Sequence, residues 1–255
     1  MNTKIDKAAR SIVKDYWLNY TKHQKEQYAF RFSCIAKMIE KDLSPLRGKS
    51  SIDIGGGWGF FSALCASLGM NSWLIDDFQD SGFKNSKDPR KKMPEKYGFK
   101  LKEVNILKEP LGMDDEYYDL ITTFDVFEHL HSSPKKIILQ SYKALKKGGL
   151  LVIGVPNCVR LTKRISTMIG KSSWSDFDNY FFSETFRGHV REYSVEDLNK
   201  IAKFLNSNNY KIIGRNFNGM ESSNIFVRSL ARFLFYFLMP MPKLCDSIFL
   251  ILKKI

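Results

Sequence analysis

The sequence predicts an α/β fold built on a doubly wound, mostly parallel sheet, and three observations support it. The apolar segment 51–54 leads into the glycine-rich turn Gly55-Gly56-Gly57. An apolar stripe over 58–68 then has the spacing of a helix. Strand-like apolar runs and helical patterns continue to alternate along the chain, which indicates a sheet covered by helices on both faces.

The remaining elements follow from local signals. The polar and basic segment 81–98 is expected to be a surface connection. A helix over 134–146 should end at Gly148-Gly149, and Ser194 is placed to cap another helix. Strands are predicted at 50–55, 72–77, 99–105, 119–125, 150–156 and 210–217, and a further helix at 159–169.

We expect these elements to form a single domain over 1–255. It begins with N-terminal helices and has a helical insertion after the fifth strand. The expected parts are a helical preface at 1–47, a cofactor-binding core at 48–157, a substrate-side insertion at 158–192 and a C-terminal half at 193–255.

The C-terminal half contains an apolar helical segment at 225–239, which Arg228 and Arg232 interrupt. It is shorter than the roughly 20 residues that span a bilayer. The segment caps the sheet, forms an interface or lies on a membrane surface. Residues 247–255 are expected to be a buried strand rather than an amphipathic anchor.

The net charge of +13 favours an anionic partner, such as nucleic acid, an acidic membrane or a phosphorylated substrate. A general lysine bias would explain the charge equally well. The four cysteines have no metal-binding spacing and indicate a reducing compartment. We therefore expect a cytoplasmic protein, with peripheral attachment to the inner face of the membrane as an extension of that expectation.

The glycine turn departs from the dinucleotide-binding fingerprint. Gly55 and Gly57 fit G-x-G-x-x-G, but Phe60 occupies the third position and Gly59 comes early. Asp53 near the strand end would repel a pyrophosphate. A carboxylate at this point suits a cationic ligand instead.

Two polar positions follow the next strands. Asp76, preferred over Asp77, lies about 20 residues past the turn, where an acid accepts hydrogen bonds from a ribose. Asn105 beside Ile106 offers an amide and an apolar surface, which suit an adenine. The alternatives are a helix cap or solvated acid for Asp76, and a loop asparagine for Asn105.

Downstream motifs make the pattern specific. They are Glu128-His129-Leu130 after a strand, the segment 145–152 (LKKGGLLV), Pro156-Asn157, and 188–194 (GHVREYS). In this order over about 48–215, they resemble class I S-adenosylmethionine-dependent methyltransferases related to the ubiquinone-biosynthesis O-methyltransferases. The resemblance implies a seven-stranded sheet and S-adenosylmethionine as cofactor, with a site formed by Asp53, Gly55, Gly56, Gly57, Asp76, Asn105, Ile106 and Asp125.

Asp125, Glu128 and His129 have helical spacing, so one helix face could carry all three. We expect them to line the cofactor and substrate pocket. A divalent metal site, which the resemblance also suggests, is less favoured, and helix capping is a third alternative. His131 is expected to face solvent.

A hydroxyl acceptor must lose its proton during methyl transfer, and a histidine can take it. His189 is the first candidate base, His129 the second, and Glu128 a further catalytic candidate. A loop-fixing role for His189 is the equal alternative. Arg187 and Arg191 could hold an anionic substrate group or pair with Glu192.

The expected function is O-methylation of a sugar or lipid-linked glycan precursor of the cell surface, with an anionic membrane surface as a further partner. An RNA methyltransferase is the charge-based alternative, but no Asn-Pro-Pro-Tyr-like element follows the fourth strand, so nucleic acid is less favoured. A quinone-like O-methyltransferase and a degenerate, non-enzymatic scaffold are the others.

Overall fold

Seven strands form one sheet in the computed structural model, which describes residues 3–16, 21–78, 92–174, 176–184, 186–219 and 222–255. The order is β3-β2-β1-β4-β5-β7-β6, and β7 runs in the direction opposite to the other six strands. This confirms the predicted mostly parallel α/β sheet. The strands are β1 (Ser50–Ile54), β2 (Asn71–Asp76), β3 (Lys100–Glu103), β4 (Tyr118–Phe124), β5 (Leu145–Pro156), β6 (Tyr210–Arg215) and β7 (Ser247–Lys253).

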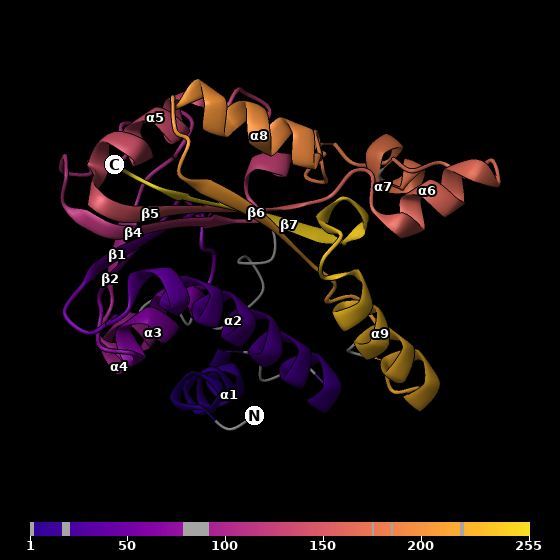
Figure 1. Ribbon diagram of the computed structural model, residues 1–255, viewed down its shortest axis with the longest axis horizontal. Helices are drawn as coiled ribbons and strands as arrows, with labels where there is room; N and C mark the ends of the chain where they lie inside the picture. The colour runs from indigo at the N-terminus through magenta and orange to yellow at the C-terminus, as the bar shows by residue number, and fades with distance from the viewer. Residues whose placement is uncertain (1–2, 17–20, 79–91, 175, 185, 220–221) are drawn as a thin grey trace.

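Helices cover both faces of this sheet (Figure 1). One face carries α1 (Lys4–Tyr16), α2 (Lys22–Leu43), α3 (Phe60–Ser67), α4 (Lys92–Tyr97) and α9 (Ile225–Leu238). The other face carries α5 (Lys135–Ala144), α8 (Val195–Phe204) and the short η2 (Phe127–His129). Two apolar clusters of buried side chains fill these two layers.

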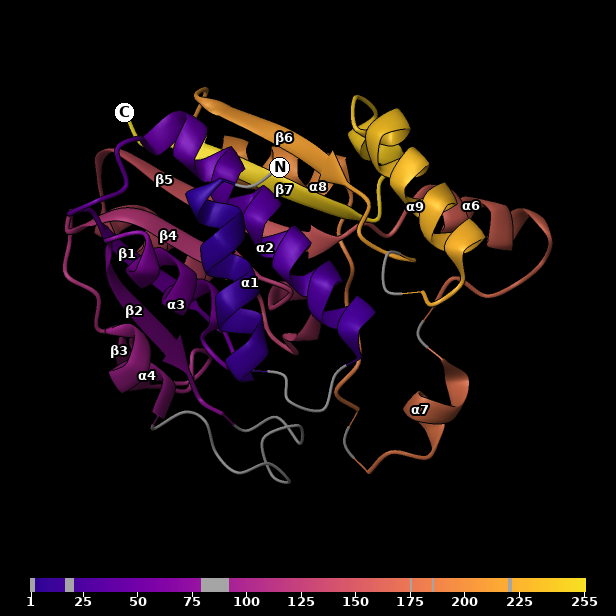
Figure 2. The same ribbon diagram turned by 90° about the horizontal axis from the view of Figure 1, so that it is seen from below.

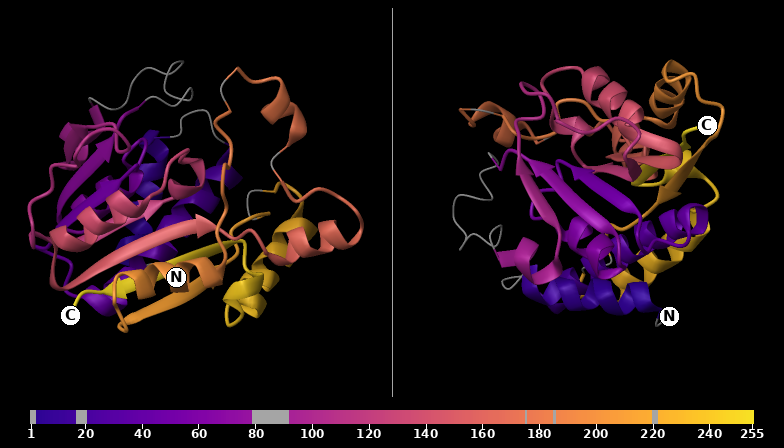
Figure 3. Two further views of the ribbon diagram at one scale, coloured as in Figure 1. Left: turned by 90° about the horizontal axis from the view of Figure 1, so that it is seen from above. Right: turned by 90° about the vertical axis from the view of Figure 1, so that its left-hand side faces the viewer.

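The insertion after β5 contains α6 (Leu161–Met168) and α7 (Phe177–Phe181), and η3 (Pro242–Leu244) precedes β7. In Figure 2 and in the left-hand view of Figure 3, α6 and α7 extend away from the sheet at its carboxyl edge. The views of Figures 1 and 2 place α9 at the same end of the molecule.

The N-terminal helices and the C-terminal strand were predicted correctly. Thr21 caps α2 and Ser194 caps α8, each through a reciprocal capping box. β7 lies between β5 and β6 and is buried along most of its length, so residues 247–253 are a central strand. Residues 17–20 of the predicted helical preface lie outside the described residues.

Several elements differ from their predicted bounds. Helix α5 ends at Ala144, before the expected stop at Gly148-Gly149, because strand pairing takes over the following residues: the Gly148 amide donates to Lys254 and the Lys254 amide to Gly149. Strand β3 ends at Glu103, since a turn begins at Asn105. The expected connection 81–98 contains a helix, α4, while its part up to residue 91 lies outside the described residues.

Candidate functional site

Two adjoining cavities open at the carboxyl ends of β1, β2 and β4, where open α/β sheets bind ligands. The first, about 480 Å³, contains the glycine turn and is called the glycine pocket. The second, about 730 Å³, is closed by the end of the insertion and is called the loop pocket. They share the lining residues Asp77, Asn105, His129 and Arg187, so together they form one two-part site.

The glycine turn is fixed to β2 by backbone hydrogen bonds. Gly55 donates to the Ile75 carbonyl at 2.7 Å, and Gly57 donates to Oδ2 of Asp76 at 2.8 Å. Both glycines have left-handed backbone angles, with φ of 68° and 55°. A Cβ on Gly55 would lie 2.6 Å from Cγ2 of Val126, so only glycine fits there without movement.

Asp53 and Gly56, both predicted to bind cofactor, lie behind this turn and do not line either pocket. Asp53 is 4% exposed and accepts a hydrogen bond from Oγ1 of Thr122 at 2.5 Å. A Cβ on Gly56 would approach Oδ2 of Asp53 to 2.2 Å. Burial, with the nearby Asp76, raises the pKa of Asp53 to about 7. In this structure Asp53 and Gly56 therefore support the glycine turn from the side that faces away from the two pockets.

Asp76 lies at the predicted place, in the wall of the glycine pocket. Its carboxylate also accepts the amide of Phe78 at 2.8 Å, and burial raises its pKa. Asp77, which the sequence left as second choice, lines both pockets and accepts a hydrogen bond from Nδ2 of Asn105 at 3.2 Å. Two adjacent carboxylates therefore line the glycine pocket.

Asn105 and Ile106 also reach the glycine pocket. Oδ1 of Asn105 accepts the amides of Leu107 and Lys108, both at 3.2 Å, which forms the turn after β3. Asn105 thus shapes the wall, while Ile106 adds an apolar surface beside it.

The predicted helical face for Asp125, Glu128 and His129 is wrong. β4 ends at Phe124, Asp125 has a left-handed φ of 54°, and only the three residues of η2 are helical. Asp125 lines the glycine pocket and forms an ion pair with Arg31 of α2. Arg31 was missed by the sequence prediction because nothing local connects it to the site.

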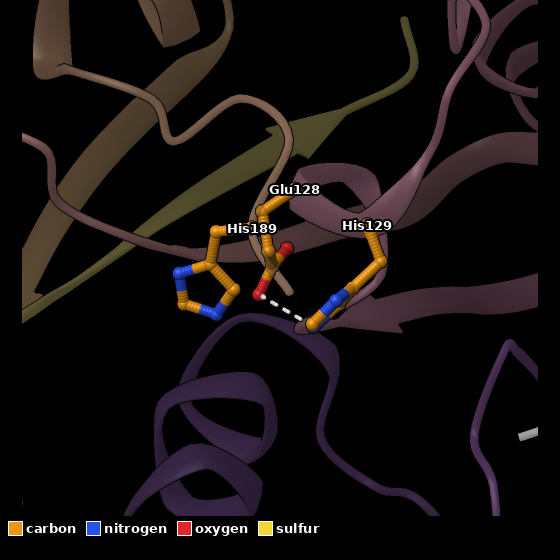
Figure 4. Close-up of side chains that lie close together, drawn as sticks. All are labelled: Glu128, His129 and His189. Carbon is orange, nitrogen blue, oxygen red and sulfur yellow. Dashed lines mark ion pairs between the residues drawn. The ribbon is translucent and has the colours of Figure 1, made fainter. Parts of the chain in front are cut away.

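Glu128, His129 and His189 come together instead, as Figure 4 shows. Glu128 is fully buried, and neither of its carboxylate oxygens accepts a hydrogen bond from the described residues. Its Oε1 lies 3.9 Å from Nε2 of His129, and the two imidazole rings are 4.9 Å apart. Burial, followed by the nearby Asp125, raises the pKa of Glu128 to about 8.

These three side chains have the chemistry of a cation site. Their candidate ligand atoms all lie within 4.8 Å of one another, and a carboxylate with two imidazoles suits several divalent metals. The buried carboxylate of Glu128, which accepts no hydrogen bond from the described residues, is the observation that fits a bound cation. A divalent metal site was the less favoured prediction, for Asp125, Glu128 and His129. The structure offers a different set of candidate ligands, in which His189 takes the place of Asp125.

His189 is oriented by Glu192. Nδ1 of His189 lies 2.7 Å from Oε1 of Glu192, which also pairs with Lys163. Burial works against ionisation of Glu192, but the hydrogen bonds from His189 and Lys163 lower its pKa to about 2. An ionised Glu192 accepts a hydrogen bond from Nδ1–H of His189, so the neutral tautomer has its acceptor nitrogen at Nε2. Arg191 pairs with Asp197, at 3.4 Å, and not with Glu192.

The loop that carries His189 is hydrogen-bonded to η2. Nδ1 of His129 lies 3.0 Å from the Arg187 carbonyl, and the Val190 amide donates to the Glu128 carbonyl at 2.7 Å. His131 is exposed, as expected, but it also lines the loop pocket and lies 3.2 Å from the Phe186 carbonyl. Trp58, inside the glycine turn, is a further lining residue that the sequence prediction did not include.

The family model described as "Methyltransferase domain" matches residues 21–212, which is most of the chain. No curated protein sequence matches this chain. A solved S-adenosylmethionine-dependent methyltransferase from Archaeoglobus fulgidus is 19% identical, with a TM-score of 0.55 over 88% of this chain and 93% of that one.

Phosphoethanolamine N-methyltransferase 2 from Haemonchus contortus, solved with S-adenosylmethionine, is 17% identical with a TM-score of 0.55, over 87% of this chain and 52% of that one. The matches do not single out the ubiquinone-type subgroup. The two solved structures share the fold of this chain at the TM-scores given. The chain therefore belongs to the methyltransferase-domain family, as a class I methyltransferase whose cofactor is S-adenosylmethionine.

Proposed function

We propose that this methyltransferase transfers the methyl group of S-adenosylmethionine to a hydroxyl of a sugar or lipid-linked glycan precursor, carried at the cytoplasmic face of a membrane. The observation that carries the proposal is His189, which is held by Glu192 with its ring 4.9 Å from that of His129, a residue that lines both pockets. Methyl transfer to a hydroxyl releases a proton, which Nε2 of His189 would accept. The rest of the acceleration comes from alignment of the two reactants.

In this proposal the glycine pocket holds the cofactor and the loop pocket the acceptor. Gly55 and Gly57 allow the methionine part to approach the backbone, and Asp76 accepts the ribose hydroxyls. Ile106 provides an apolar surface for the adenine. Arg187, which lines both cavities, is placed to contact an anionic group of the acceptor.

A second candidate uses a divalent cation to activate the same acceptor. Glu128, His129 and His189 would hold it, and the absence of hydrogen bonds to the buried Glu128 carboxylate from the described residues favours it. Such an ion would lower the pKa of a bound hydroxyl and so supply the ionised acceptor. In that case His189 binds the ion and is not the base.

The acceptor class is tested with methyl-labelled S-adenosylmethionine and four defined acceptors. They are a polyprenyl-diphosphate-linked disaccharide, a hydroxylated quinone analogue, phosphoethanolamine and a transfer RNA transcript. We expect label in the disaccharide as a methyl ether. Phosphoethanolamine represents the amine class named for the Haemonchus contortus enzyme. Label in phosphoethanolamine or RNA alone would contradict the proposal, and label in the quinone would shift it to small metabolites.

The proposed contact between Asp76 and the ribose is tested by measuring how one variant binds two ligands that differ only in the ribose hydroxyls. Asp76→Ala should weaken S-adenosylhomocysteine binding by about 10-fold or more, because a hydrogen bond to a charged group is worth about 1.5–3 kcal/mol. It should weaken a 2′,3′-dideoxy analogue much less. Calorimetry measures both.

Asp76 also accepts the amides of Gly57 and Phe78, so a general collapse of the turn must be separated from a lost ribose contact. Collapse would weaken both ligands equally. That result would remove Asp76 as the ribose acceptor and direct the same experiment to Asp77.

A further inference from the structure

Helix α9 has one anchored face and one exposed apolar face. Ala231, Phe235 and Leu238 are buried, and the Phe235 ring lies 5.1 Å from Phe30 of α2. The opposite face exposes a row of large apolar side chains with helical spacing: Phe226, Leu230, Phe233 and Phe237. Phe226 is 82% exposed, and the rings of Phe233 and Phe237 stack at 5.4 Å. An apolar row of this kind marks an interaction surface.

Helix α6 adds to this surface. It has no buried residue, and its outer side chains Ile165, Met168 and Ile169 are exposed, Met168 by 85%. Arg164 ties its start to η3, through a hydrogen bond of 3.5 Å to the Lys243 carbonyl. Figures 1 and 2 place α6 and α9 at the same end of the molecule. We call the exposed residues of α6 and α9 the basic–apolar surface.

The charges of this surface have one sign. Residues 157–174 and 222–245 contain no Asp or Glu, while Arg164, Lys171, Arg232 and Lys243 are exposed there. Helix α7 is different, since it carries Asp178 and begins at Asp176, and it is not included. Uniform positive charge opposes pairing of the surface with a second copy of itself. It is complementary to anionic headgroups, while the aromatic row suits the acyl boundary.

We propose that the basic–apolar surface binds the protein to an anionic lipid bilayer. The 14 residues of α9 lie along the interface, and none of the helices in the described part of the chain is long and apolar enough to cross a bilayer. The aromatic side chains enter the acyl boundary and the arginines contact headgroup phosphates. Lys163 of α6 pairs with Glu192, which orients His189, so the bound membrane lies next to the site.

The test is co-sedimentation of the full-length protein with phosphatidylcholine vesicles, with and without one quarter phosphatidylglycerol. We expect at least about tenfold tighter binding to the anionic vesicles, largely lost in about 0.5 M salt. Phe233→Glu combined with Phe237→Glu should weaken it at least about tenfold, because two exposed apolar anchors become charged. Arg232→Gln should weaken it about fivefold, as expected for one basic group near an anionic surface.

Matched controls lie on α8, outside the surface. Phe204→Glu replaces a similarly exposed aromatic, and Lys200→Gln removes an exposed charge. Neither should change vesicle binding. Circular dichroism and calorimetry with S-adenosylhomocysteine verify that each variant is folded, so that loss of vesicle binding is not loss of structure.

Three results would overturn the proposal. One is absence of vesicle binding by the folded wild type, and another is equal binding to neutral and anionic vesicles. The third is a dimer in sedimentation velocity that the double variant dissociates, which would assign the surface to a second copy. Because no methyl transfer is measured, failure here leaves the proposed reaction untouched.

Discussion

Replacing Gly57 by valine is expected to abolish measurable S-adenosylmethionine binding. Gly57 has a φ of 55°, which a β-branched residue adopts only at a cost of about 1–3 kcal/mol. Its amide also holds Asp76, so displacement of the backbone moves the proposed ribose acceptor. Strain alone predicts a loss of up to about 100-fold in affinity, and branched carbons in the pocket wall add to it. Calorimetry with the purified variant measures the effect.

Gly148→Val is the matched control. Gly148 has a φ of 77°, a Cβ there would meet no atom within 4 Å, and it does not line the described pockets. This variant should lose stability through the same strain but retain cofactor affinity. Equal affinity losses in both variants would mean that the Gly57 effect is a general loss of folding. Wild-type affinity in Gly57→Val would remove the glycine turn from the cofactor site.

His189→Ala is expected to lower the rate of methyl transfer by about 10²–10⁴-fold, the range for removal of a general base. The dissociation constant of S-adenosylmethionine should change little, because His189 does not line the glycine pocket. The measurement is kcat with whichever hydroxyl acceptor takes label, together with calorimetry of the cofactor.

His131→Ala provides the comparison for a merely structural role. Both imidazoles interact with the insertion loop, His131 with the Phe186 carbonyl and His189 with Glu192. If His189 only held the loop, the two variants would lose similar activity. A chelator separates the base from the cation: activity lost in EDTA and restored by Mg²⁺ or Mn²⁺ would assign Glu128, His129 and His189 to a metal site. Calorimetric titration of the metal alone would confirm that assignment if the wild type binds the metal and the Glu128→Gln variant does not.

Local signals account for the parts of the fold and site that the sequence predicted. The glycine turn and Asp76 belong to one strand–turn–helix–strand unit, so periodicity and spacing were sufficient to place Gly55, Gly57 and Asp76 in one pocket. The capping residues of α2 and α8 are local in the same sense, because a cap bonds only the first turn of its own helix.

Long-range contacts account for what it could not predict. The Arg31–Asp125 pair joins α2 to the end of β4, and His189 reaches Glu128 only because the insertion loop attaches to η2. The spacing of Asp125, Glu128 and His129 suggested one helix face. Asp125 instead has a left-handed backbone conformation at the end of β4, so it does not lie on a common helix face with the other two. The end of α5 depended on pairing with the C-terminal strand segment at Lys254.

A crystal structure with S-adenosylhomocysteine tests the central claim most directly. We expect the ligand in the glycine pocket, with its ribose hydroxyls hydrogen-bonded to Asp76, its adenine against Ile106, and its sulfur directed toward the loop pocket and His189. A ligand bound elsewhere, or a sulfur directed away from the loop pocket, would contradict it.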